Sequence, residues 1–222
     1  MSRRLNLPDS ASVATPAPDG KLFAPSAARN RDAIVALVAR VAPPRGRALE
    51  LASGTGQHVV ALAARLPGLD WQPSDADPAR LDSIAAHAAE AGLPNLRAPV
   101  PLDATEPGWA ADHGGQDLIL LVNLLHLVST PEARWLVTEA ARALAPGGRL
   151  VIYGPFRRGG VLTSPGDASF HASLTAQDPE IGYKDDTEMQ DWLTGAGLTL
   201  RETVEMPANN LAFVAQADRA EG

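Results

Sequence analysis

The 222-residue sequence contains no cysteine, which excludes disulfide bonds, a thiolate metal site and a cysteine nucleophile. It also lacks any apolar run of about 18 residues, so we expect no membrane-spanning helix. Its first residues include two arginines but no apolar segment after them, which argues against a secretory signal. Together these absences favour a cytoplasmic protein.

Basic residues are fewer than acidic ones, with 19 Lys and Arg against 26 Asp and Glu, and the net charge is −7. Phosphate backbones require a basic surface, so this balance argues against a nucleic-acid partner. The His, Asp and Glu residues show no metal-ligand spacing, and we expect no metal. The sequence specifies no oligomeric state.

The order of the predicted elements indicates one α/β domain over residues 22–217, preceded by a flexible N-terminal arm over residues 1–21. Its strands and helices alternate, which predicts a mostly parallel, seven-stranded sheet with helices on both faces and a C-terminal antiparallel hairpin. Residues 155–183 contain many Gly, Pro and Ser residues and little periodicity, so we expect a substrate lid or loop there.

Apolar periodicity and turn residues set the expected boundaries of these elements. The predicted helices cover residues 26–41, 57–66, 77–92, 130–144 and 185–196. The predicted strands cover residues 48–52, 69–74, 96–102, 117–123, 149–154, 198–206 and 211–216.

The most informative segment is a short strand that carries Glu50 and runs into the turn Ser53-Gly54-Thr55-Gly56 before a helix. Glycine permits a tight turn and close approach of a ligand, and the helix directs free N–H groups at the same space. The dinucleotide fingerprint requires a third glycine where this chain has Val59. A carboxylate at Glu50 would repel a pyrophosphate but would pair with the cationic amino-acid end of S-adenosylmethionine. The alternative interpretation is a plain Gly-rich loop.

This spacing resembles motif I of the class I S-adenosylmethionine-dependent methyltransferases, which usually have glycine at the position of Ala52. The resemblance implies the Rossmann-like fold of that class and S-adenosylmethionine as cofactor, with S-adenosylhomocysteine as product. The residues expected to contact the cofactor at this motif are Glu50, Ala52, Ser53, Gly54, Thr55, Gly56 and His58.

Further candidates follow the ends of the next strands. Asp75 lies about 20 residues beyond the glycine turn, where an acid can accept hydrogen bonds from both ribose hydroxyls. Asp103 could accept the adenine amino group, although a solvated turn acid is the alternative. Asn123 and Leu124 end the buried strand and should face the sulfonium. His126 could deprotonate an acceptor or could pack, so we expect Asn123 and His126 as the catalytic candidates.

Over residues 22–216 the sequence resembles the family of methyltransferase-like protein 26 and its bacterial relatives. Matching pieces include Ala28-Arg-Asn-Arg31, Trp71-Gln-Pro-Ser-Asp75, Tyr153-Gly-Pro-Phe-Arg-Arg158, Phe170-His-Ala-Ser-Leu174 and Glu205-Met-Pro-Ala-Asn-Asn-Leu211. Arginine forks hold carboxylates bidentately, so these pieces suggest an anion-binding face of the pocket. The substrate-binding candidates are Arg29, Asn30, Tyr153, Phe156 and Arg157, with solvated helix and loop residues as the alternative.

We therefore expect methyl transfer from S-adenosylmethionine to a small, possibly anionic, acceptor. Three alternatives remain open. A non-catalytic S-adenosylmethionine-binding module fits the same motifs, and an NAD(P)-dependent oxidoreductase shares the strand, turn and ribose acid. A methyltransferase that acts on protein or nucleic acid is not excluded by the net charge alone.

Overall fold

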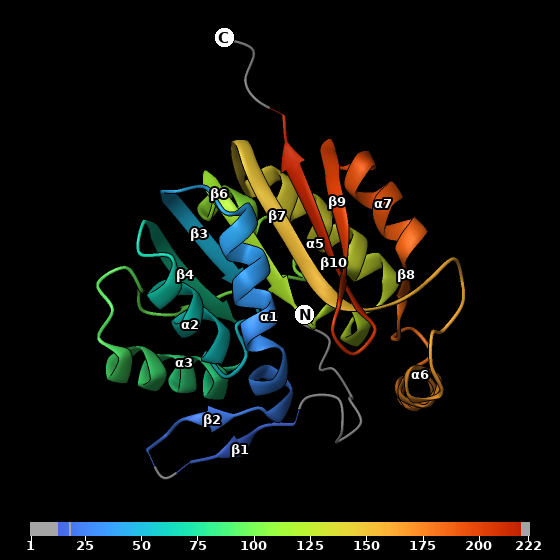
Figure 1. Cartoon of the computed structure of the whole chain (residues 1–222), viewed down its shortest axis with the longest axis horizontal. Helices are drawn as coiled ribbons and strands as arrows, with labels where there is room; N and C mark the ends of the chain where they lie inside the picture. Colours follow the sequence, from blue (N-terminus) through green and yellow to red (C-terminus); the bar gives the residue numbers. More distant parts are fainter. Residues whose placement is uncertain (1–12, 18, 219–222) are drawn as a thin grey trace.

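The computed structural model describes residues 13–17 and 19–218, and it is built on a twisted sheet with strand order β5-β4-β3-β6-β7-β10-β9 (Figure 1). Strands β3 to β7 run parallel, and β10 is antiparallel to both of its neighbours. The predicted α/β class, the mostly parallel sheet and the C-terminal hairpin are confirmed. The strands are β3 (Gly46–Leu51), β4 (Leu69–Asp75), β5 (Val100–Pro101), β6 (Gln116–Val122), β7 (Leu144–Arg157), β9 (Leu198–Met206) and β10 (Asn210–Ala217).

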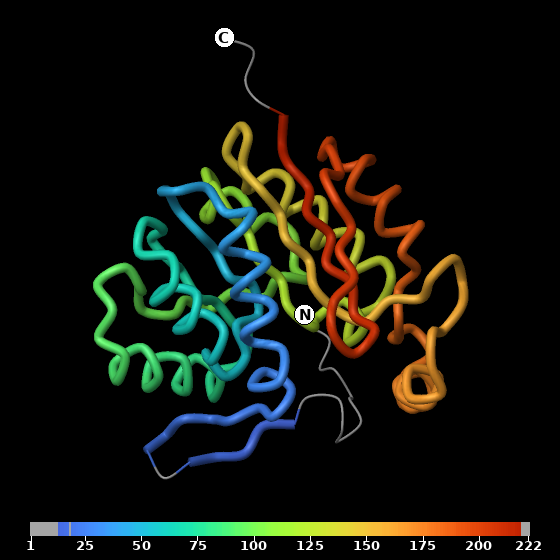
Figure 2. The backbone as a smooth tube through the Cα atoms, viewed as in Figure 1, coloured from blue at the N-terminus to red at the C-terminus, as the bar shows by residue number. Residues whose placement is uncertain are grey.

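Helices cover both faces of the sheet (Figures 1 and 2). One face packs against α1 (Pro25–Val41), α2 (Gln57–Arg65) and α3 (Pro78–Ala91). The other packs against α4 (Trp109–Asp112), α5 (Thr130–Ala143) and α7 (Asp186–Gly195). Before α1, the short strands β1 (Thr15–Pro16) and β2 (Leu22–Phe23) form a hairpin. Among the described residues, no helix is long and apolar enough to cross a bilayer.

Strand β6 shows why the sheet needs both helical layers. Its residues Leu118 and Leu120 belong to the cluster under α1 and α2, whereas Ile119 and Leu121 belong to the cluster under α5 and α7. All four side chains are fully buried. Successive side chains of a strand point to opposite faces, so an unbroken apolar run fits a strand covered on both sides.

Two predicted boundaries were wrong. The strand expected over residues 96–102 shrinks to β5, because Pro99 and Pro101 have no N–H to donate to a ladder. The segment before it still meets β4 through single bonds, from Trp71 N to the Asn95 carbonyl at 2.8 Å and from Arg97 N to the Trp71 carbonyl at 2.9 Å. The strand expected over residues 149–154 extends to 144–157 as β7.

The segment over residues 155–183 is more ordered than expected, since it contains α6 (Pro165–Gln177). Ser164 caps this helix by accepting a hydrogen bond from Asp167 N at 3.1 Å, and Pro165 occupies its first turn. In Figure 1, α6 is seen end-on and stands apart from the other helices. Much of the expected N-terminal arm, residues 1–12 and 18, lies outside the described residues.

Glu139 of α5 anchors the loop that follows β5. Its buried carboxylate accepts hydrogen bonds from Gly108 N at 2.9 Å and Ala110 N at 3.1 Å, and it pairs with Arg142 at 2.8 Å. The side chain is nearly inaccessible to water, so these N–H groups have no easy replacement partner. Glu139 therefore fixes the start of α4 and the loop that leads to it.

We expect Glu139→Ala to lower the free energy of unfolding by about 1–3 kcal/mol, because it leaves buried N–H groups unsatisfied. Urea denaturation of the variant and of wild type measures the difference. Glu106→Ala, at an exposed position of the same loop, serves as the control and should change stability by less than about 0.5 kcal/mol. Equal effects of the two substitutions would contradict the anchoring role.

Candidate functional site

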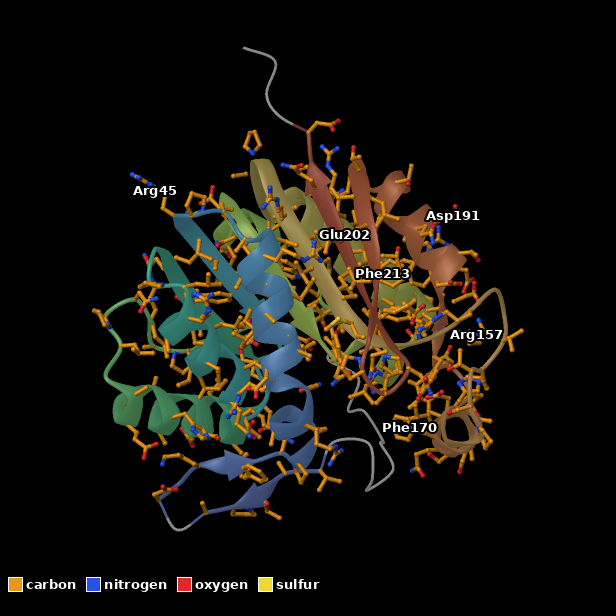
Figure 3. The ribbon with its side chains drawn as sticks, in the orientation of Figure 1. Arg45, Arg157, Phe170, Asp191, Glu202 and Phe213 are labelled. Carbon is orange, nitrogen blue, oxygen red and sulfur yellow. The ribbon has the colours of Figure 1, made fainter. Side chains whose placement is uncertain are left out.

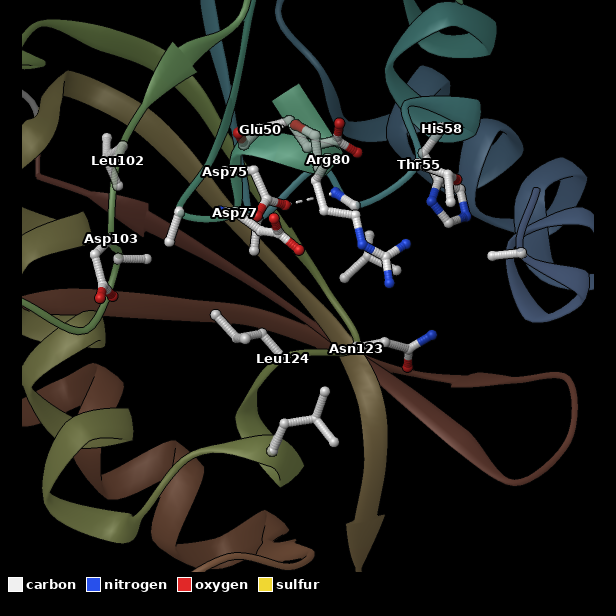
Figure 4. A pocket seen from close by; sticks show the side chains of 18 of the residues that line it. Glu50, Thr55, His58, Asp75, Asp77, Arg80, Leu102, Asp103, Asn123 and Leu124 are labelled. Carbon is white, nitrogen blue, oxygen red and sulfur yellow. Dashed lines mark hydrogen bonds between the residues drawn. The ribbon is translucent and has the colours of Figure 1, made fainter. Parts of the chain in front are cut away.

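Strands β3, β4 and β6 end at one edge of the sheet, and a cavity of about 720 Å³ opens there (Figure 4). Figure 4 places Leu102 and Asp103 at one end of this cavity and His58 at the other, with Glu50, Asp75 and Arg80 between them. Such an edge is where open α/β sheets bind ligands. Further lining residues come from the glycine turn, the start of α1 and the segment after β6: Ser26, Ala27, Ala52, Ser53, Gly54, Thr55, Val122, Asn123, Leu124, Leu127 and Val128.

The turn after β3 has the left-handed backbone expected of a glycine loop. The φ angles of Gly54 and Gly56 are 60° and 91°, and a Cβ on Gly56 would lie 3.0 Å from the Ile84 Cα. Ala52 also has a positive φ, of 49°, which is costly for a residue with a Cβ. This conformation gives a physical reason why glycine would suit the position of Ala52.

Glu50 is the most unusual group at the cavity. Its side chain is 1% exposed, and its Oε2 has no hydrogen-bond partner among the described residues. Burial, and secondarily the charge of Asp75, raises the pKa of Glu50 to about 8, against a hydrogen bond from Ser53 that lowers it. A buried acceptor of this kind is stabilised by a cationic donor. Glu50 can therefore hold a positively charged group that enters the cavity.

Asp75 is the last residue of the neighbouring strand β4, and its carboxylate is hydrogen-bonded to two backbone N–H groups. Its Oδ2 accepts a hydrogen bond from Gly54 N at 2.9 Å, and its Oδ1 accepts one from Asp77 N at 3.0 Å. Burial raises the pKa of Asp75, although these N–H groups oppose the shift. Each carboxylate oxygen can accept further bonds, so Asp75 remains able to bind hydroxyl groups. Asp77 accepts from Ala79 N at 2.9 Å and caps α3, as expected.

Asp103, Asn123 and Leu124 line the cavity from the other two strand ends. Asp103 is half-buried, and its Oδ1 accepts bonds from Thr105 N at 3.0 Å and Thr105 Oγ1 at 2.6 Å. Asn123 has a φ of 57°, and its backbone N donates to the Tyr153 carbonyl at 2.9 Å. A non-glycine residue held in this region is a sign of a functional constraint.

Two residues that sequence reasoning missed tie the N-terminal hairpin to the glycine turn. Ser83 of α3 accepts a hydrogen bond from Leu22 N at 2.8 Å and donates to the Thr55 carbonyl at 2.9 Å. Gln57 Oε1 accepts from Ala24 N at 2.7 Å and from Thr55 Oγ1 at 2.9 Å. The position of Gln57 directly after the turn was a usable signal, whereas nothing in the sequence marked Ser83.

His126 does not line the cavity. It lies in the short 3-10 helix η1 (Leu125–Leu127), with its ring in edge contact with Phe170 at 5.8 Å and Tyr183 at 6.2 Å between centroids. Burial, with a smaller contribution from the charge of Lys184, lowers the pKa of His126 to about 3. The side chain is therefore a neutral and weak base at pH 7, and its contacts are those of a packed residue.

The substrate-binding candidates fall into two groups. Asn30 and Tyr153 are buried and do not line the cavity themselves, but Asn30 is hydrogen-bonded to His58, which does. Arg29 is exposed on α1. Phe156 is 2% exposed and packs edge-on against Phe213, with ring centroids 4.9 Å apart. The structure therefore does not bring Arg29 or Phe156 to the cavity.

Arg157 is also directed elsewhere. Its guanidinium lies 4.0 Å from the carboxylate of Asp185 and 3.6 Å from that of Glu188. Figure 3 shows Arg157 beside α6 and α7, on the far side of the sheet from α1 and α2. These two carboxylates already interact with the positive charge of Arg157, which an anionic ligand would need. In the part of the chain that the structure describes, no three His, Asp or Glu side chains gather in a way that could hold a metal ion.

Solved methyltransferases have the same architecture. An O-methyltransferase family protein from Burkholderia thailandensis superposes with a TM-score of 0.74 at 20% identity, over 86% of this chain and 57% of its own. The S-adenosylmethionine-dependent methyltransferase SibL gives 0.71 at 23%, over 87% and 56%. An O-methyltransferase family 2 protein from Planctomyces limnophilus, in complex with apigenin, gives 0.68 at 23%, over 82% and 56%. The chain thus spans a little over half the length of these proteins.

The sheet order and these superpositions define the fold as that of the class I methyltransferases. Residues 21–217 match the family described as "Protein of unknown function (DUF938)", so the chain belongs to that family. Both findings agree with the resemblance drawn from the motifs.

The raised pKa of Glu50 predicts how stability depends on pH. The folded protein keeps a proton on Glu50 between pH 4.5 and about 8, where the unfolded chain releases it. Stability therefore falls as pH rises through this window, by on the order of a few kcal/mol. Glu50→Gln cannot titrate, so its unfolding free energy, measured by urea denaturation from pH 5 to 8, should fall less steeply than that of wild type. Parallel curves would contradict the assignment.

Proposed function

We propose that this protein transfers a methyl group from S-adenosylmethionine to a small-molecule acceptor. The observation that carries this proposal is the buried Oε2 of Glu50, which lacks a partner among the described residues and lies beside the glycine turn. The cationic amino-acid end of S-adenosylmethionine supplies the donor that this oxygen requires. A pyrophosphate, by contrast, offers this oxygen no donor, which disfavours NAD(P).

The residues around the cavity fit the rest of this cofactor. Asp75 would accept the ribose hydroxyls, and Asp103 with Leu124 would border the adenine at the far end of the cavity. Ala52, Ser53, Gly54, Thr55 and Gly56 would hold the amino-acid part, and Asn123 would border the methyl group. Bound S-adenosylmethionine would supply a methyl group already activated by its sulfonium. The protein's own task is then to align the acceptor and exclude water.

The net charge of −7 argues for a small-molecule acceptor over a nucleic acid, and the missing cysteines support a cytoplasmic location. An anionic acceptor would require Arg29 or Arg157 to turn toward the cavity, away from solvent or from existing ion pairs. We also propose that α6 and its flanking residues cover the acceptor.

We expect Asp75→Ala to weaken S-adenosylhomocysteine binding by about ten- to a hundredfold, because charge-assisted hydrogen bonds to the ribose are worth about 1.5–3 kcal/mol. Titration calorimetry measures the affinity. Asp82→Ala, at an exposed position of α3, is the matched control and should bind as wild type does. Unchanged affinity in Asp75→Ala would remove the ribose assignment, and binding of NAD without binding of S-adenosylhomocysteine would overturn the function.

The proposed lid predicts a gradient of hydrogen exchange. The segment packs through a small separate cluster of Leu127, Leu174, Ile181 and Tyr183, and only Leu174 of α6 is fully buried. Amides of residues 165–177 should therefore exchange at least about tenfold faster than those of β6. S-adenosylhomocysteine and an acceptor together should slow them, as for a lid that closes. Mass spectrometry that shows equal protection of both regions, with and without ligands, would argue against a lid.

A further inference from the structure

Asn30, His58 and Tyr153 form a buried polar cluster that the cofactor does not account for. They come from three elements, α1, α2 and β7, and they are 8%, 7% and 2% exposed. His58 Nε2 lies 2.8 Å from Asn30 Oδ1. Burial raises the pKa of Tyr153, and the Asn30 side chain opposes this larger effect by lowering it. The cluster therefore links the first turn of α2 to α1 and to β7.

The hydrogen bonds fix the state of the imidazole. Asn30 Oδ1 can only accept, so His58 Nε2 must carry the proton. Asn30 Nδ2 is then the end of the amide that can donate toward the Tyr153 oxygen, which agrees with the lowering effect of Asn30 on the pKa of Tyr153. Burial, aided by the charge of Arg31, lowers the pKa of His58 to about 4, so the ring is neutral. Nδ1 therefore has a free lone pair, with no partner among the described residues.

His58 presents this lone pair at a defined place. It lines the cavity, unlike His126, and it stands opposite the end that holds Leu102 and Asp103 (Figure 4). Asn123 lies on the same side of the view as His58. If the adenine occupies the Asp103 end, the imidazole is at the end where the methyl group and the acceptor meet.

The chemistry of this end restricts the acceptor. A carboxylate has no proton to donate, so an anionic group would repel the Nδ1 lone pair. A cationic group would meet the positive charge of the cofactor, whose amino-acid end the proposed function places at Glu50. The partner that suits Nδ1 is an uncharged donor, and a hydroxyl supplies both a proton for Nδ1 and lone pairs that can accept a methyl group.

We propose that His58, oriented by Asn30 and Tyr153, binds the hydroxyl group of an uncharged acceptor at Nδ1, and that this protein therefore methylates neutral hydroxyl compounds. The C–O bond would form as the C–S bond of the sulfonium breaks, and the hydroxyl proton would pass to Nδ1 and from there to water. The assignment rests on the proposed function. His58 acts as a binding residue that directs the acceptor oxygen, and Asn30 and Tyr153 act as positioning residues that hold the ring in one tautomer.

The test uses the complex with S-adenosylhomocysteine, which blocks transfer, and two probes of similar shape. Phenol has a hydroxyl donor, and anisole has the same ring without one. Long-range ¹H–¹⁵N correlation spectra of the histidines should show His58 as the Nε2–H tautomer. Phenol should shift the His58 Nδ1 resonance toward its hydrogen-bonded position, and anisole should leave it unchanged.

Two variants separate this role from simple packing. His58→Gln places an amide near Nε2, so it retains the bond to Asn30 but loses the acceptor at Nδ1. His58→Asn places a carbonyl near the position of Nδ1. Phenol affinity should fall about three- to tenfold in His58→Gln and recover in part in His58→Asn, while the melting temperature of His58→Gln stays close to that of wild type.

Each contrary outcome has a distinct meaning. No shift on phenol addition, or equal phenol affinity in His58→Gln, would overturn the acceptor assignment while S-adenosylhomocysteine still binds. A shift produced by S-adenosylhomocysteine alone, with none added by phenol, would assign Nδ1 to the cofactor and would also overturn it. Failure of S-adenosylhomocysteine to bind wild type would instead overturn the proposed function.

Discussion

The buried carboxylate of Glu50 is the constraint on which the rest of the site depends. Glu50 lies at the end of the central strand β3, where the sheet provides no counter-charge. Its backbone carbonyl accepts hydrogen bonds from the hydroxyls of Ser53 and Ser74. These bonds fix the turn, and the hydrogen bond from Gly54 N to Asp75 fixes it further. The turn is thus fixed around an acid that the fold alone leaves unsatisfied. A buried acid of this kind lowers stability relative to an apolar residue, and under the proposed function that cost is offset when the cofactor binds.

The two imidazoles near the cavity differ in role because they differ in surroundings. His126 is packed against the aromatic rings of Phe170 in α6 and of Tyr183, and His58 is held by a side-chain amide at the cavity wall. Both are neutral for the same reason, which is burial. The two rings differ in their hydrogen bonds. A hydrogen bond at one ring nitrogen fixes the tautomer, and the tautomer decides whether the other nitrogen can accept a proton donor.

The sequence predicts the parts of the fold that depend on short, local patterns of residues. Four examples are the strand with Glu50, the glycine turn, the apolar run that ends at Asn123 and the Asp77 cap. The strand β5 is short because Pro99 and Pro101 lack the N–H donors of a ladder. Helix α6 carries no apolar stripe that would predict it, and the Ser164 cap and Pro165 mark only its start. Tyr153 and Phe156 lie an odd number of residues apart on β7, so strand geometry alone sends them to opposite faces. The partners of Arg157 come from the short strand β8 (Lys184–Asp185) and from α7, and no local pattern could have revealed them.

Thr55 links the floor of the cavity to its N-terminal border along two routes, one through Ser83 to Leu22 and one through Gln57 to Ala24. These hydrogen bonds couple the hairpin to the glycine turn. An outward movement of the hairpin would therefore break bonds along both routes. Leu127 of η1, by contrast, joins the wall of the cavity to the small cluster under α6 and takes no part in either route. On the proposed function, ligands would therefore enter at lower cost beside η1 than past the hairpin.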